Sequence, residues 1–114
     1  MTSDEFAKNF YLEKLIFLKS CFEEQPKYPS AVNAKIKEMA LSNSQQEQLK
    51  DVIDNLLTDV FYSVLLGLDG EHSIGNTQHT YKIYDEEGNL ISHCGELKTS
   101  AYEYFHEGKY EKQQ

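Results

Sequence analysis

An unbroken row of apolar residues near the middle of the chain limits the possible folds more than any other feature. Apolar side chains recur every three or four positions, the repeat of one face of an α-helix. Ser44 and Glu47 have the spacing of a capping box, which predicts Ser44 as the N-cap of this helix, and Gly67 and Gly70 predict its end. A helix this apolar must pack against other elements. The row consists of Leu49, Val52, Ile53, Leu56, Leu57, Val60, Phe61, Val64, Leu65 and Leu68.

Two helices are predicted before this one. Thr2 or Ser3 is a suitable N-cap for the first, which ends at the two prolines of the chain. Ser30 is a suitable N-cap for a second helix from Ala31 to about Leu41. The first helix has a broad apolar stripe, and its remaining face is predicted to be polar, with Lys8, Glu13, Lys14 and Lys19.

The periodicity changes after Gly70, and a β-hairpin is predicted. Residues 80–84 are rich in strand-forming side chains, and residues 90–93 are their predicted partner strand. Residues 85–89 fit a type I turn with Gly88 in the left-handed position. Because an isolated hairpin is marginal in water, its apolar face must lie on the helices or on another chain.

A last helix follows the hairpin and ends at Gly108, and the tail over residues 109–114 is expected to fray. The sequence therefore predicts one domain over residues 1–114, of the α+β class, with three N-terminal helices, a β-hairpin and a C-terminal helix. The apolar positions of the last helix are Leu97, Ala101, Tyr104 and Phe105.

The charge of the chain excludes some classes of partner. The net charge is -8, and all eleven basic residues are lysines. Arginine is the preferred residue for phosphate and base-edge contacts, so direct nucleic-acid binding is not expected.

No apolar run approaches the roughly 20 residues of a membrane span. The first ten residues carry Asp4 and Glu5 where a signal peptide has positive charge. We therefore expect a cytoplasmic chain with two free thiols and no membrane contact.

No catalytic residue, cofactor or metal site is predicted. The four histidines are scattered, and His93 and Cys94 are adjacent in a predicted strand, so they point to opposite faces. Residues 69–80 do not fit a calcium loop, because Ile74 and Thr80 occupy the positions of its glycine and its bidentate glutamate. Cys94, near the start of the last helix, is the single candidate nucleophile, and an idle thiol is the simpler interpretation.

Acidic residues form two groups that are candidates for binding a partner. Those on the long helix share one face, and the others lie at the tip of the predicted hairpin. A solvated surface is the simpler interpretation, and the functional alternative is a docking surface that attracts a basic protein. The candidate residues are Glu47, Asp51, Asp54, Asp59, Asp85, Glu86 and Glu87.

The segment from Leu49 to Leu97 resembles small uncharacterised bacterial proteins, some of which are immunity proteins of toxin–immunity systems. The motifs that carry the resemblance are Leu68–Gly70, Tyr81–Leu90 and Glu96–Leu97, at the end of a long apolar helix. The resemblance implies a stoichiometric inhibitor that binds a toxin, and it implies no catalytic residue.

Three functions remain open. The first is a non-enzymatic binding protein, of the immunity type, that neutralises a basic protein toxin through an acidic face. The second is a small enzyme or ligand-binding domain that uses Cys94 and a nearby histidine. The third is a structural homodimer in which the hairpins of two copies pair.

Overall fold

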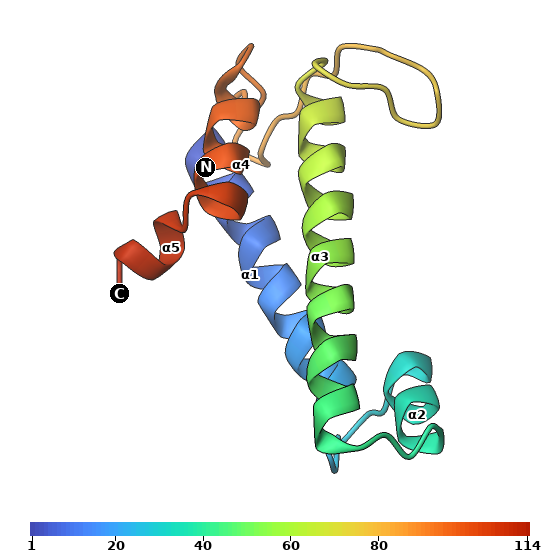
Figure 1. Ribbon diagram of the computed structural model, residues 1–114. Coiled ribbons are helices and arrows are strands. Elements are labelled where there is room, and N and C mark those ends of the chain that lie inside the picture. Colours follow the sequence, from blue (N-terminus) through green and yellow to red (C-terminus); the bar gives the residue numbers. More distant parts are fainter.

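The computed structural model describes all 114 residues, and its regular secondary structure is entirely helical. The longest helix, α3, runs along most of the molecule, and α1 crosses it (Figure 1). α4 packs against both, while α2 lies at the end where α3 begins (Figure 1). None of the helices combines the length and the apolar character that crossing a bilayer requires. The helices are α1 (Ser3–Phe22), α2 (Ala31–Glu38), α3 (Asn43–Leu68), α4 (Glu96–His106) and α5 (Lys109–Lys112).

The predicted α+β class is wrong, because the chain contains no β-strand. The β-hairpin predicted over residues 80–93 is reduced to one isolated bridge, between Tyr84 and Leu90. The turn inside it is present: Gly88 has a φ of 87°, and its N–H donates to the Asp85 carbonyl at 3.0 Å. The segment is a loop closed by a turn.

Side-chain hydrogen bonds explain why no ladder forms beyond this bridge. The Ile83 N–H donates to the Ser92 hydroxyl oxygen at 2.9 Å, and that hydroxyl donates to the Tyr81 carbonyl at 3.0 Å. Serine hydroxyls compete in this way for the backbone groups that secondary structure uses. Since no third strand lies alongside, nothing stabilises a more regular pairing.

Capping residues determine where the long helices begin. The N-caps predicted for α1 and α2 are confirmed, with Thr2 and Ser30 in these positions. α3 begins two residues earlier than predicted: Ser42 Oγ accepts from the Gln45 N–H at 3.2 Å, and Gln45 Oε1 accepts from the Ser42 N–H at 2.9 Å. The predicted pair has the same spacing but lies inside the helix, because the polar run before the apolar row offers two overlapping capping boxes.

The core lies where α1, α3 and α4 meet. Only 15 of the 114 residues are buried, so the core is small. α3 contributes to it through its C-terminal half, with Leu65 in the buried cluster and Phe61, Tyr62 and Leu66 packed against it. The buried cluster consists of Ala7, Tyr11, Leu65, Ala101, Tyr104 and Phe105.

Gly67 lies inside α3 and does not end it, which corrects its predicted role. Ile74, from the loop after α3, packs against this glycine, and a Cβ atom at position 67 would lie 2.3 Å from Ile74 Cγ1. The loop reverses at Gly75 and Asn76, whose φ angles of 60° and 65° are those of a two-residue hairpin turn. Gly67 therefore makes room for a loop residue on the surface of α3.

The last residues of the chain pack against the first helix. The sequence predicts a frayed tail over residues 109–114, whereas the structure forms α5 over Lys109–Lys112. Lys109 Nζ donates to Asp4 Oδ1 at 2.6 Å, and the Tyr104 hydroxyl donates to Asp4 Oδ2 at 2.8 Å. These bonds tie α5 and α4 to the first turn of α1.

We expect acid to weaken this tie. Burial opposes ionisation of the Asp4 carboxyl, but the hydrogen bonds from Lys109 and Tyr104 outweigh it and lower the pKa of Asp4 below its ordinary value of 3.8. A carboxylate with a lowered folded pKa contributes stability that is fully present above its unfolded pKa and is lost as the pH falls through the folded value.

The Asp4→Asn variant should therefore be less stable than the natural chain near neutral pH, by under about 1 kcal/mol for this partly exposed pair. In urea unfolding curves that difference should shrink below about pH 3. A difference of unchanged size at low pH would contradict the assignment.

Candidate functional site

The seven acidic residues predicted to bind a partner do not converge. The group on α3 extends toward the end of the molecule where α2 lies, whereas residues 85–87 lie in the loop before α4, in the opposite half (Figure 1). The residues that are exposed and belong to no ion pair are Glu47, Asp51, Asp59, Glu86 and Glu87. The other two, Asp54 and Asp85, have structural partners.

Asp54 serves the fold by balancing a buried charge. Lys14 is only 7% exposed, and its Nζ lies 2.7 Å from Asp54 Oδ1 and 5.2 Å from the centre of the Tyr11 ring. A buried ammonium group needs a counter-charge, so Asp54 is committed to Lys14. The predicted place of Lys14 on the polar face of α1 is therefore wrong. Lys14 lies seven residues after Ala7 and seven residues before Cys21, and both of these residues are buried. Because seven residues make about two helical turns, this spacing indicates that Lys14 lies on the buried side of α1.

Asp85 serves the turn that replaces the predicted hairpin. Its side chain accepts hydrogen bonds from the amino group of Met1 at 2.9 Å and from the backbone N–H groups of Glu87 and Asn89 at 3.0 and 2.9 Å. The bond from the Met1 amino group is the main cause that holds the pKa of Asp85 well below its ordinary range. Asp85 is thus an ionised turn residue whose oxygens already have partners.

One row of apolar side chains on α3 is exposed to solvent. Val52, Leu56 and Val60 follow one another at intervals of four residues, and their exposed fractions are 61%, 58% and 47%. We call these three residues the α3 apolar face. The sequence predicts that this row lies in the core, but the core side of α3 is the side of Phe61 and Leu65.

The width of the apolar row explains this difference. At 100° per residue, its ten members spread over roughly 200° of the helix circumference. α1 and α4 cover only one edge of that arc, since Leu65 is fully buried while Ile53, Leu57 and Val64 are half-buried. The other edge has no covering element. Sequence reasoning could have detected an open face from the breadth of the row.

A groove continues the α3 apolar face toward the C-terminal end of the helix. It has a volume of about 360 Å³ and lies between α3 and the loop segment that packs on Gly67. Val60, Val64 and Ile74 supply its apolar walls. Asp59, exposed and unpaired, stands at its edge beside Ser63. The groove therefore offers an apolar recess next to a free carboxylate.

The molecule exposes more surface than a compact monomer of its size. Its accessible area is 7766 Å², whereas a monomer of this mass exposes about 6,400 Å². Its radius of gyration is 16.3 Å, whereas a compact domain of this length has about 13 Å. The excess of roughly 1,300 Å² is larger than the ~800 Å² that one partner buries in a standard protein interface. The molecule is therefore more extended than a compact monomer of this length.

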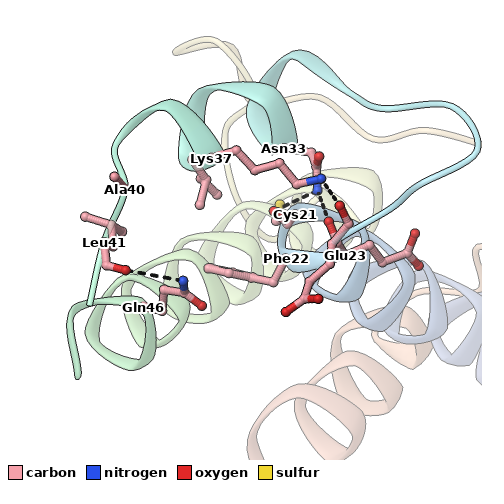
Figure 2. Close-up of a pocket in the computed structure, with 10 residues that line it drawn as sticks. Cys21, Phe22, Glu23, Asn33, Lys37, Ala40, Leu41 and Gln46 are labelled. Carbon is pink, nitrogen blue, oxygen red and sulfur yellow. Dashed lines mark hydrogen bonds between the residues drawn. The ribbon is translucent and has the colours of Figure 1, made fainter. Parts of the chain in front are cut away.

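A second pocket, of about 210 Å³, lies where the end of α1 meets α2 (Figure 2). Asn33 is 1% exposed, and its Nδ2 donates to the carbonyls of Ser20, Cys21 and Glu23 at 3.0, 3.2 and 2.9 Å. These are carbonyls that the end of a helix leaves without partners. The Asn33 Oδ1 atom has no partner and points away from these carbonyls (Figure 2). We assign this pocket to the joint between two helices.

The structure offers no catalytic arrangement around the cysteines. Both are free, as predicted: Cys94 is exposed, and Cys21 is buried, which raises the pKa of its thiol. A hollow beside Cys94 is lined by Ser3, Asp4 and other residues of α1 and α4, and none of its lining residues is a histidine. No three histidine, cysteine or acidic side chains lie close enough together to hold a metal ion.

No protein-family model, curated protein or solved structure matches this chain. The resemblance to immunity proteins therefore stays a prediction.

Proposed function

We propose that this chain is a non-enzymatic binding protein that captures a basic protein through the α3 apolar face. The observation that carries the proposal is the exposure of Val52, Leu56 and Val60 beside the unpaired carboxylate of Asp59. Protein interfaces combine an apolar centre with a polar, solvent-accessible rim. Acidic rim groups accelerate the encounter with a basic partner and select against acidic ones.

Within this class, the function we favour is an immunity-type inhibitor of a basic toxin. The segment that resembles immunity proteins, Leu49–Leu97, contains the whole α3 apolar face and the groove beside it. An inhibitor that acts by occupying a surface needs no catalytic group, and a net charge of -8 without arginine suits a basic target.

The two alternatives have less support. A homodimer formed by paired hairpins has no strands to pair. An enzyme based on Cys94 has no histidine lining the hollow beside its thiol. Neither alternative accounts for the exposed aliphatic row on α3.

Capture followed by neutralisation tests the proposal. The full chain is immobilised and exposed to a lysate of its source organism, next to a Leu56→Glu bait and a Val32→Glu bait. Val32 is a matched control, since it is an apolar residue of another helix, α2, with 50% exposure. We expect a lysine- and arginine-rich protein on the natural and Val32→Glu baits but not on the Leu56→Glu bait. Expression of that protein alone should arrest growth, and co-expression of this chain should restore it.

The outcomes separate the two parts of the proposal. A basic partner that depends on Leu56 but has no toxicity would contradict the inhibitor function and leave the binding function standing. Equal retention on the Leu56→Glu and Val32→Glu baits, or no retained basic protein, would contradict both.

A further inference from the structure

We infer that the α3 apolar face receives an amphipathic α-helix whose apolar stripe is bordered by lysine or arginine. The inference depends on the proposed function for the existence of a partner, and it specifies the structural element and the chemistry that this partner presents.

The shape of the surface favours a helix over a strand. Val52, Leu56 and Val60 form a ridge of the i, i+4 type, which packs into the groove between ridges of another helix. With Val64 the ridge covers 13 residues, a rise of about 18 Å, which is enough for about three turns of a partner helix. A strand would need free backbone groups, and those in the middle of α3 are used by the helix itself.

The groove at the end of the ridge favours one large apolar anchor. Val60, Val64 and Ile74 surround a recess of about 360 Å³ that is open to solvent. Ile74 is itself 39% exposed, so its side chain is free to contact an incoming residue. A leucine or phenylalanine of the partner helix would enter this recess and cover part of these three side chains.

The charge around the ridge favours a basic occupant and argues against a second copy of the chain. Asp59 is exposed at the edge of the groove and belongs to no ion pair, and Lys50 is the one basic residue between Gln45 and Thr80. In a two-fold dimer the same patch meets itself, so the acidic edge of one copy would face that of the other. A lysine or arginine next to the anchor would instead pair with Asp59.

Synthetic helices test the inference without any host protein. The main probe is a fluorescent peptide of about 18 residues, long enough for a stable helix, with leucine on one face and lysine on the other. One comparison peptide has glutamate in place of lysine. Another has the composition of the main probe in an order that gives no apolar face. We expect saturable binding of the first peptide alone, measured by fluorescence anisotropy.

Variants locate the binding. The Leu56→Ser variant should bind the lysine peptide with an affinity at least about tenfold lower, because a central interface residue is lost. The Asp59→Asn variant should lower this affinity about threefold at low salt. At high salt it should change the affinity little, because salt screens a charge at the rim of an interface. Val32→Ser, the matched exposed valine on α2, should leave the affinity unchanged. Thermal unfolding of each variant confirms that the fold is intact.

Three results would overturn the inference. The first is equal binding of the peptide that has no apolar face, which would indicate plain charge attraction. The second is an affinity that Leu56→Ser does not change. The third is a dimer in sedimentation experiments that Leu56→Ser dissociates, because the face would then be covered by a second copy. Since these peptides are not toxins, the helix inference can hold even where the inhibitor function fails.

Discussion

The Asn33→Asp variant is expected to lose about 3–5 kcal/mol of unfolding free energy, the largest single effect that the structure predicts. The change keeps the size of the side chain but replaces its amide donor with a carboxylate. Three donated hydrogen bonds would disappear, and the new charge would face the carbonyls of Ser20, Cys21 and Glu23 in a site that is only 1% exposed. These carbonyls form the negative end of the α1 dipole, which adds to the repulsion.

Urea unfolding measures this loss, and hydrogen exchange in α2 shows where it acts. Asn55→Asp is the matched control, because it makes the same chemical change at an exposed position of α3. We expect a shift of under about 0.5 kcal/mol for this surface substitution. If both variants unfold at the same urea concentration, the joint between α1 and α2 does not depend on Asn33.

The Asp69→Ala variant should lose about 2–3 kcal/mol, because Asp69 provides the cap of a helix that has none of its own. α4 begins after Gly95, which has no side chain to accept a hydrogen bond. Asp69, at the end of α3 and 6% exposed, accepts from the Gly95 and Lys98 N–H groups, each at 3.1 Å. Its removal would leave both N–H groups unpaired and would take a negative charge from the start of α4.

Amide exchange at Gly95 and Lys98, together with the unfolding free energy, checks this prediction. Glu71→Ala is the control: Glu71 lies 3.8 Å from the Lys98 ammonium group, in a pair that is exposed on both sides. Such a pair contributes under about 1 kcal/mol. Similar losses in the two variants would show that Asp69 acts only as a surface charge and not as a cap.

These roles affect how the proposed binding surface should be tested. Asp54 belongs to the same acidic group as Asp51 and Asp59 in the sequence, but its replacement would leave Lys14 buried without a counter-charge. A loss of partner binding in an Asp54 variant would therefore not distinguish a contact from a weakened fold. Asp59 and Leu56 are better positions, because neither has a structural partner of this kind.

Local interactions made several features predictable from the sequence. The caps at Thr2 and Ser30 involve residues within three positions of each other, and so does the turn at Gly88. The helical repeat of the long apolar row is local in the same sense. Such features depend on backbone geometry and short-range hydrogen bonds, which a stretch of sequence contains in full.

Tertiary packing decided the rest. The sequence alone determined that α3 is a long helix with far more apolar surface than one neighbour can cover. Only the structure decided which part of that surface is covered, because periodicity shows which residues favour burial and not what buries them. α1 and α4 cover the side of Leu65, and the side of Leu56 stays exposed. The ion pair between Lys14 and Asp54 and the hydrogen bonds from Asn33 to the end of α1 also join segments that are distant in the sequence. No local pattern specifies such contacts.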